Sequence, residues 1–284
     1  MIKIENLNYI YQPDMPHSVS ALNNVNLEIK TGEFVSIIGH TGSGKSTLIQ
    51  HLNALIRPSS GRIEIDGRDI TAPDADLKAV RKDVGLVFQY PEHQLFEETV
   101  YRDIAFGPAN MGFSEDEIKE AVLSAAKAVN ISEEMLDKSP FELSGGQKRR
   151  VAIAGVLAMK PKILILDEPV AGLDPHGRRG IMRLLKNLHK ENSDQTIIIV
   201  SHNMEDVAEL AERVIVLNHG TVAMQGTVGE VFEKSDELWE MGLSVPEITK
   251  LVHTLNKEGA DLPGDIYTVD RAAEILAERI KRNV

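Results

Sequence analysis

The chain has 284 residues, of which 42% are hydrophobic and 26% charged, and its formal net charge is −12. This length suits one large α/β domain with a modest extension, or two small domains. The acidic balance argues against a nucleic-acid partner, because phosphate backbones are bound by clustered cations. Without cysteine the chain forms no disulfide or thiolate metal site, which fits a reducing, cytosolic setting. No run of about 18 apolar residues occurs, so we expect any membrane-crossing part of its process to belong to other subunits.

The first 55 residues alternate short β-like runs with turns and then become helical. The β-like runs occupy residues 2–7, 25–29 and 34–38. The third run leads directly into a glycine-rich segment. Residues 46–55 then carry apolar side chains at helical spacing, namely Leu48, Ile49, Leu52 and Leu55. Strand, glycine loop and helix in this order form the setting of a phosphate-binding loop.

The middle of the chain predicts a doubly layered α/β core with a helical insertion. Residues 61–70 and 84–89 are β-like, and residues 91–157 are mainly helical, with residues 115–129 the clearest helix. Two near-continuous apolar runs follow, at residues 163–166 and 196–200. Such runs are typical of parallel strands that are buried on both faces.

After about residue 231 the pattern changes to a small helical appendage. Residues 244–247 resemble a capping box, and one apolar face follows, formed by Ile248, Leu251, Val252 and Leu255. A turn at residues 259–264 precedes a last helix with Ala272, Ile275, Leu276 and Ile280 in register. We therefore divide the chain into residues 1–230 and an extension of residues 231–284. The apolar face either supports dimerisation or packs against its own chain.

The glycine-rich segment carries the chemistry of triphosphate binding. It reads Gly39-His40-Thr41-Gly42-Ser43-Gly44-Lys45-Ser46. Glycines let backbone N–H groups turn toward phosphate oxygens. Lys45 supplies a cation for the β- and γ-phosphates, and the Ser46 hydroxyl can bind Mg²⁺. A chance glycine turn is the alternative, but the preceding strand and the following helix favour the phosphate loop.

Four polar residues follow three of the predicted strands. Asp167 and Glu168 end the run 163–166, Gln89 ends the run 84–88, and His202 follows the run 196–200. The carboxyl ends of parallel strands are where α/β sheets place ligands. Asp167 is placed to hold Mg²⁺ through its water shell, and Glu168 to polarise the attacking water. Gln89 could contact Mg²⁺ and that water, and His202 the γ-phosphate, although a lone glutamine or histidine at a strand end is often structural.

Together these residues resemble the ATP-binding cassette ATPases over nearly all of residues 1–230. The motifs that carry the resemblance are the phosphate loop with Thr47 after it, Gln89 of the glutamine loop, the signature motif Leu143-Ser144-Gly145-Gly146-Gln147, the second Walker motif 163–167 with Glu168, the D-loop Ala171-Gly172-Leu173-Asp174, and the switch histidine His202. The resemblance implies a P-loop NTPase nucleotide-binding domain. It has a RecA-like core, an antiparallel β subdomain, a helical subdomain at about 91–157 and here a helical C-terminal extension. It also implies that Tyr11 stacks on adenine, and that the signature motif of one subunit contacts the ATP held by another.

A narrower resemblance lies in residues 90–96, 99–108 and 167–175, which are similar to the energy-coupling factor transporters, and within them to the second of two ATPase subunits. This implies an ATPase, peripheral at the cytoplasmic face of the cell membrane, that powers uptake of a vitamin or metal ion with ATP and Mg²⁺. The implied partners are a second ATPase (a heterodimer rather than a homodimer), a transmembrane coupling protein and a substrate-binding membrane subunit. Leu95, Phe96, Glu97 and Glu98 suit a groove for a cytoplasmic helix of the coupling protein, or else an ordinary acidic helix start. A free-standing cytosolic ATPase is the alternative function, and the cargo is not encoded in this chain.

Overall fold

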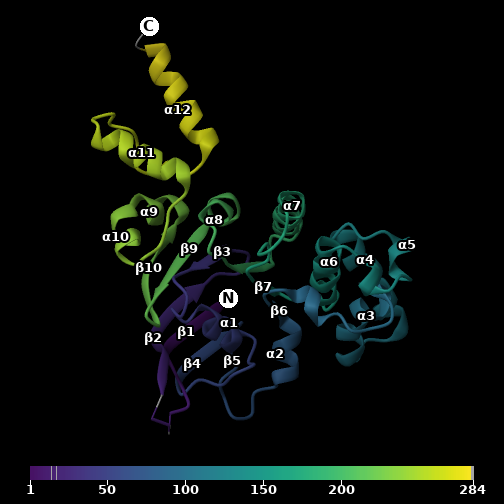
Figure 1. The fold of residues 1–284 in the computed structure, drawn as a ribbon. Coiled ribbons are helices and arrows are strands. Elements are labelled where there is room, and N and C mark those ends of the chain that lie inside the picture. The colour runs from purple at the N-terminus through teal and green to yellow at the C-terminus, as the bar shows by residue number, and fades with distance from the viewer. Residues whose placement is uncertain (14, 17, 283–284) are drawn as a thin grey trace.

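The computed structural model describes residues 1–13, 15–16 and 18–282, with side chains through residue 278. Two β-sheets form its framework (Figure 1). The six-stranded sheet has the order β10-β9-β3-β8-β7-β6, parallel from β9 to β6, with β10 antiparallel at its edge. The four-stranded sheet β2-β1-β4-β5 is antiparallel throughout. The strands are β1 (Ile2–Tyr11), β2 (Val19–Ile29), β3 (Phe34–Ile38), β4 (Ser60–Ile65), β5 (Arg68–Asp69), β6 (Val84–Val87), β7 (Ile163–Asp167), β8 (Thr196–Val200), β9 (Arg213–Asn218) and β10 (Thr221–Thr227).

The parallel strands are buried on both faces, as their apolar runs predict. Every residue of β3 and β8 is buried. Because side chains alternate across a strand, Phe34 of β3 packs in one apolar cluster with helix α7, whereas Val35 packs in another with helix α1 and the antiparallel sheet. The α/β core with an antiparallel β subdomain is therefore confirmed.

The helices surround the sheets in three groups. Helices α1 (Lys45–Leu52), α2 (Leu77–Asp83), α7 (Pro175–Glu191) and α8 (Met204–Leu210) accompany the core. The predicted helical insertion contains α3 (Val100–Asn110), α4 (Glu115–Ala128), α5 (Glu133–Leu136), α6 (Gly145–Leu157) and the 3₁₀ turns η1 (Pro91–Gln94) and η2 (Pro140–Glu142). Helices α9 (Val228–Glu233), α10 (Ser235–Glu240), α11 (Glu247–Lys257) and α12 (Val269–Arg282) end the described chain. None of the described helices is long and apolar enough to cross a membrane.

Two expected details of the helices are wrong. Helix α1 ends at Leu52 because Ala54 adopts a left-handed backbone with φ of 51°, so Leu55 lies beyond the helix and is 43% exposed. The expected capping box at residues 244–247 does not form. Pro246 occupies the N-cap of α11, and the Glu205 carboxylate of α8 accepts a hydrogen bond from the Glu247 N–H at 3.1 Å. A residue distant in sequence thus supplies the cap.

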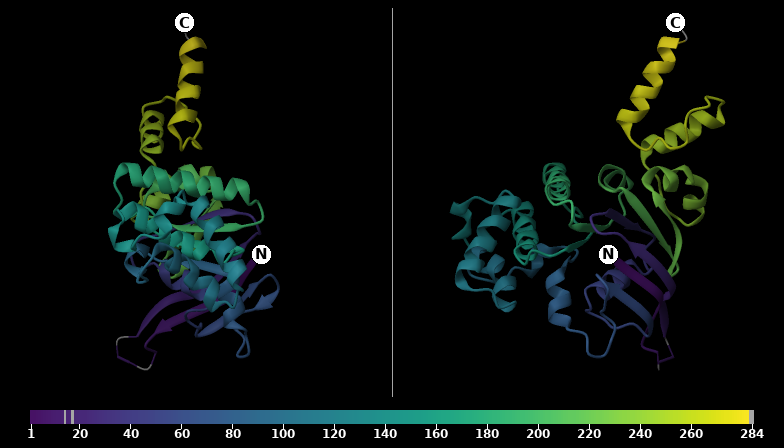
Figure 2. Two further views of the ribbon diagram at one scale, coloured as in Figure 1. Left: turned by 90° about the vertical axis from the view of Figure 1, so that its right-hand side faces the viewer. Right: turned by 180° about the vertical axis from the view of Figure 1, so that it is seen from behind.

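The C-terminal helices divide into two packing units. Helices α9 and α10 share an apolar cluster with β9 and β10, whereas α11 and α12 pack around Val252, Leu262, Ile266 and Ala272. Figures 1 and 2 show α11 and α12 projecting from one end of the molecule. Of the expected apolar face, Ile248, Val252 and Leu255 join this small cluster, and Leu251 is 48% exposed. The side chain of Ile280 lies outside the described residues.

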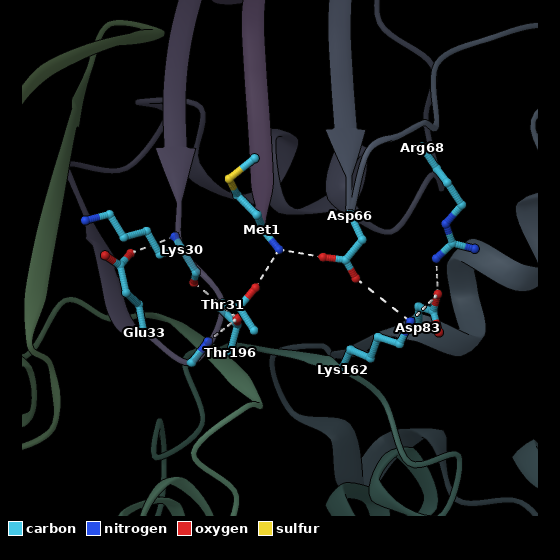
Figure 3. A network of polar contacts seen from close by, with 10 residues as sticks. Met1, Lys30, Thr31, Glu33, Asp66, Arg68, Asp83, Lys162 and Thr196 are labelled. Atoms are coloured by element: carbon cyan, nitrogen blue, oxygen red, sulfur yellow. Dashed lines mark hydrogen bonds and ion pairs between the residues drawn. The ribbon is translucent and has the colours of Figure 1, made fainter.

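A polar network joins the two sheets where the parallel strands begin (Figure 3). The Met1 amino group donates to Asp66 at 2.6 Å and to Thr31 at 2.8 Å. Lys162, just before β7, lies 3.9 Å from Asp66 and 3.6 Å from Asp83. Ion pairs therefore stabilise the end of the sheet where the parallel strands begin. The candidate ligand residues lie at the opposite ends of these strands.

Candidate functional site

The loop of residues 39–46 joins β3 to α1 and has a backbone that requires glycine. Gly42 has φ of 82° and Gly44 has φ of 102°, and a Cβ atom on Gly44 would lie 2.5 Å from the Ala21 carbonyl oxygen. Lys45, the first residue of α1, is 6% exposed. Its ammonium group donates to the carbonyl oxygens of Gly39 at 2.7 Å and His40 at 2.9 Å. Burial lowers the pKa of Lys45, although Glu168 and Asp167 oppose this. The cation is therefore held across the loop by carbonyl groups that an anion can replace.

The outer side of the loop rests on the turn after β9. The His40 ring lies 2.8 Å from the Thr41 carbonyl oxygen and 3.1 Å from the Asn218 side-chain oxygen. The Ser43 hydroxyl is buried without a hydrogen-bond partner among the described residues. The two contacts of the His40 ring fix the shape of the loop before any ligand binds.

Helix α1 carries two hydroxyl groups toward other parts of the site. The Ser46 hydroxyl donates to the Asp167 carboxylate at 3.3 Å, so β7 and α1 place two hard oxygen ligands together. Burial raises the pKa of Asp167, against the effects of Ser46 and Lys45. The Thr47 hydroxyl lies 3.2 Å from the hydroxyl of Tyr11.

Tyr11 is the exposed member of an aromatic pair. It is 40% exposed and packs edge to face on Tyr9 with ring centroids 4.8 Å apart. Tyr9 packs against the core cluster beneath the phosphate loop and against His51. Of the two tyrosines, Tyr11 thus has a ring surface free for a ligand.

Glu168 and His202 face each other from the ends of β7 and β8. The Glu168 carboxylate lies 3.5 Å from His202 Nε2, and its buried Oε1 atom has no hydrogen bond among the described residues. Glu168 has φ of 48°, an unfavourable backbone for this residue. Burial, and then the charge of Asp167, raise the pKa of Glu168 to about 7. Burial also lowers the pKa of the half-exposed His202, with Lys45 adding to the effect. The arrangement favours a carboxylate that accepts protons near neutral pH.

The side chain of Gln89 lies apart from Glu168 and His202. Gln89 lies two residues beyond β6 on an exposed segment, and its side chain makes no hydrogen bond to any described residue. No group of three or more histidine, aspartate or glutamate side chains that could hold a metal occurs among the described residues. A metal at this site would therefore need ligand oxygens besides those of Ser46 and Asp167.

The signature motif forms a second group, away from the phosphate loop. Ser144 is the N-cap of α6 and shares a capping box with Gln147, whose side chain accepts from the Ser144 N–H at 2.9 Å. Gly145 and Gly146 are helical, and a Cβ atom on either would meet no atom of the described residues within 4 Å. Glycine is thus not required here by this chain. In Figure 1, α6 lies in the helical group beyond β6 and β7, away from α1.

The D-loop lies beside the signature motif. Asp174 is the N-cap of α7 and accepts from the Gly177 N–H at 2.6 Å. Together the two motifs line a cavity of about 500 Å³ that also includes Arg150 and His176. The candidate residues therefore fall into two groups, one around residues 39–47 and the other around residues 144–147 and 174.

The sequence did not single out one buried arginine in the site. Arg149 lies between Lys148 and Arg150 in the sequence, yet it is 1% exposed. It binds both oxygens of Glu92 at 2.6 and 2.9 Å, and the carbonyl oxygens of Pro169 and Ala171 at 3.2 and 2.6 Å. It thus ties the signature helix to the segment after Gln89 and to the D-loop. Arg149 lies one turn before the buried Ile153 on α6, but no local pattern distinguishes it from the basic residues on either side.

Comparison with known families and proteins gives a consistent picture. The family described as ABC transporter matches residues 22–171. The energy-coupling factor transporter ATP-binding protein EcfA2 of Caldanaerobacter subterraneus subsp. tengcongensis is 57% identical over 280 residues, which cover 99% of this chain and 98% of the relative. The protein of the same name from Clostridium perfringens is 55% identical over 283 residues, which cover 99% of both.

Two solved structures are similar in both fold and sequence. One is cbiO1 from Clostridium perfringens, part of the ABC transporter complex cbiONQ, with a TM-score of 0.74 and 44% identity, covering 89% of this chain and 98% of that one. The other is the ATP-binding cassette MJ0796, a dimer in a post-hydrolysis state bound to ADP and Pi. It has a TM-score of 0.71 and 34% identity, and covers 80% of this chain and 99% of that one.

Proposed function

This chain belongs to the ABC transporter family, and from that premise we propose that it is the ATP-hydrolysing subunit of an energy-coupling factor importer. Its nearly full-length similarity to proteins named energy-coupling factor transporter ATP-binding protein EcfA2 supports this assignment. The observation that carries the mechanism is the division of the nucleotide residues into two groups on one chain.

The two groups are proposed to complete two different ATP sites across an interface. A Cβ atom on Gly145 or Gly146 would meet no atom among the described residues, so we explain their lack of side chains by a group that approaches from outside. The free N–H groups at the start of α6 suit a phosphate. We assign Ser144, Gly145, Gly146 and Gln147, with Asp174, to the nucleotide held by a second subunit. The dimeric state named for the cassette MJ0796 supports a dimer.

The phosphate-loop group is proposed to hold ATP of this chain. Backbone N–H groups of residues 39–46 and the Lys45 ammonium bind the β- and γ-phosphates. Thr47 continues this contact at the start of α1, and Tyr11 stacks its exposed ring on adenine. Lys45 then exchanges its two carbonyl partners for phosphate oxygens, which removes the cost of burying an ammonium without an anion.

The residues present fit Mg²⁺ when ATP is bound. The Ser46 hydroxyl and the Asp167 carboxylate already lie together and are oxygen ligands of the kind Mg²⁺ prefers. Gln89 is proposed as a third contact, reached by movement of its exposed segment. When bound, the ion neutralises charge on the β- and γ-phosphates.

Hydrolysis is assigned to Glu168, with His202 and Gln89. Glu168 accepts a proton from the attacking water because its buried carboxylate has a raised pKa, and its Oε1 atom, 3.5 Å from His202 Nε2, makes no hydrogen bond among the described residues. His202 faces the same point from β8 and donates a hydrogen bond to the γ-phosphate. Gln89 helps to orient the water. Closure of the dimer around two ATP molecules, and its reopening after hydrolysis, supply the work of transport.

The membrane partners are proposed from the family and from one exposed patch. Phe96 is 59% exposed and packs edge to face on Phe106, which is 47% exposed, at 4.9 Å between ring centroids. Glu97 and Glu98 lie beside this pair, and the Asp103 carboxylate fixes the turn by accepting from the Phe96 N–H at 3.2 Å. An exposed aromatic pair next to acids suits a basic, partly apolar helix of a coupling protein. We therefore place the chain at the cytoplasmic face of the membrane, in a heterodimer with a related ATPase and beside a subunit that captures a vitamin or metal ion.

The decisive experiment combines one variant with one purification. Glu168→Gln is expected to bind ATP and associate with its partner ATPase while hydrolysis falls by at least about a hundredfold. Full hydrolysis by that variant would remove Glu168 from its assigned role. Co-purification from detergent extracts is expected to recover a membrane protein. Recovery of the ATPase alone, in extracts where the membrane subunits are expressed, would favour a free-standing cytosolic ATPase.

A further inference from the structure

Two loops of the site are joined by a side chain that the mechanism above does not use. Helix α7 begins immediately after Asp174 of the D-loop. Helix α8 begins immediately after Asn203, the neighbour of His202. The two helices pack against each other, and Arg178 in the first turns of α7 reaches the first turn of α8. Figure 1 shows α7 and α8 on the same side of the molecule.

The guanidinium of Arg178 binds the N-cap residue of α8 and a residue in its first turn at once. Its Nε and Nη2 atoms donate to Asp206 Oδ1 at 3.0 and 2.7 Å, and Nη2 also donates to Asn203 Oδ1 at 3.0 Å. The same Asn203 oxygen accepts from the Asp206 N–H at 3.0 Å, which caps α8. The arginine therefore fixes both the cap of α8 and the direction in which the chain leaves His202.

This geometry exceeds what neutralising a buried acid requires. Asp206 is 2% exposed, and a simple ion pair would compensate its charge without any contact to Asn203. Arg178 is 37% exposed, so its remaining N–H groups could be satisfied by water. Its Nε and Nη2 atoms instead converge on one oxygen of Asp206 while Nη2 also reaches a neutral acceptor, so one planar group holds both residues.

We propose that Arg178 is a positioning residue that couples the loop of Asp174 to the loop of His202. Its consequence for catalysis rests on the proposed function, in which Asp174 faces the ATP of the partner and His202 faces the ATP of this chain. A displacement of Asp174 by the partner moves α7, and Arg178 carries that movement to Asn203 and the adjacent His202. The two composite ATP sites are thereby linked through a single chain.

The test separates positioning from charge compensation. Arg178→Gln leaves Asp206 buried and unpaired, so it is compared with the neutral pair Arg178→Gln/Asp206→Asn and with Asn203→Ser, which keeps an N-cap residue but shortens the acceptor. Arg179→Gln is the matched control, because Arg179 is exposed on the same turn and has no ion pair or hydrogen bond among the described residues. ATP hydrolysis is measured on the assembled transporter, and the ring signals of His202 are followed by NMR in the full-length, nucleotide-free chain.

We expect the neutral pair to recover the thermal stability that Arg178→Gln loses, while its kcat stays lower than wild type by between about tenfold and about a hundredfold at unchanged KM for ATP. Asn203→Ser is expected to lower kcat in the same way, and both are expected to shift the His202 ring signals. Wild-type kcat in the neutral pair, or unshifted His202 signals in Asn203→Ser, would overturn the proposal. The NMR result stands even if Glu168→Gln hydrolyses ATP normally, so failure of the coupling and failure of the proposed function are told apart.

Discussion

Replacing Glu168 by glutamine is expected to stabilise the nucleotide-free and metal-free protein in a pH-dependent way. The pKa of Glu168 rises from 4.5 to about 7 because of burial and of the charge on Asp167. The folded chain therefore holds a proton that the unfolded chain releases at lower pH. Below pH 4.5 the Glu168 carboxyl is protonated in both the folded and the unfolded chain, and the stability it contributes in this neutral form is fully present. This stability is lost as the pH rises through about 7, because the buried carboxyl of the folded chain then ionises.

The magnitude follows from the size of the shift. About 1.4 kcal/mol for each pH unit gives a penalty of about 3 kcal/mol above pH 7. Glutamine has nearly the shape of the protonated acid and no charge. Glu168→Gln should therefore raise the free energy of unfolding by about 3 kcal/mol at pH 8 and by less than about 1 kcal/mol at pH 5. The left-handed backbone at residue 168 is the same in both proteins and cancels from the comparison.

Guanidinium denaturation at the two pH values, in EDTA and without nucleotide, measures the difference. Glu240→Gln is the control, because Glu240 is exposed on α10 and makes no ion pair or hydrogen bond among the described residues. The control should change the unfolding free energy by less than about 0.5 kcal/mol at either pH. An equal effect of Glu168→Gln at pH 5 and pH 8 would refute the argument, since only a titrating carboxylate makes the difference depend on pH.

Three further predictions follow from the same structure. Gly146→Ala should stabilise the chain by about 0.5 to 1 kcal/mol, because a Cβ there meets no atom of the described residues and alanine favours the helix. ATP hydrolysis by this variant should nevertheless fall at least about tenfold. Normal hydrolysis would exclude close approach of a partner's nucleotide. Charge reversal at Glu97 and Glu98 should weaken binding of the membrane subunits in a pull-down, and unchanged binding would favour an ordinary acidic helix start. A chain ending at residue 245 removes α11 and α12 but keeps the apolar cluster of α9 and α10 on their β-sheet, Val245 included. If the extension supports dimerisation, nucleotide-free association measured by light scattering should be lost. Retained association would leave Ile248, Val252 and Leu255 with a packing role only.

Much of the fold could be predicted because its strongest signals are local. Strands β3, β7 and β8 are continuous apolar runs, since each is covered on both faces, and α4 carries a complete capping box of Ser114 and Glu117 within its own sequence. The end of α1 and the cap of α11 were missed for the opposite reason. Just beyond α1 the Ala54 carbonyl oxygen accepts from the Arg81 side chain of α2, 27 residues away. Glu205, which caps α11, is 42 residues away from Glu247 in sequence. A helix terminus fixed by tertiary contact leaves no pattern in the neighbouring residues.

In the candidate site, too, residues demanded by local geometry could be predicted, whereas residues whose role depends on contacts between distant segments could not. The glycines of residues 39–44 and the strand-end carboxylates are visible in sequence because loop geometry and strand ends demand those residue types. Arg149 and Arg178 are not visible, because a charged residue on a helix ordinarily lies in solvent. Arg149 is buried only because Glu92 and the Pro169 and Ala171 carbonyl groups converge on it from two other segments.

Both arginines bind residues in or directly beside the loops of the site, and this explains where they occur. The glutamine loop, the D-loop and the loop of His202 are short segments outside helices and strands, so apolar packing alone would leave their positions poorly defined. A guanidinium offers several N–H donors in one plane and can hold carbonyl and carboxylate oxygens from two loops in a fixed relation. Arg149 does so between the segment after Gln89 and the D-loop, and Arg178 between the D-loop helix and the segment after His202. The loops that must move together in the proposed cycle are thus joined by hydrogen bonds, and we propose that these bonds carry displacement from one loop to the other.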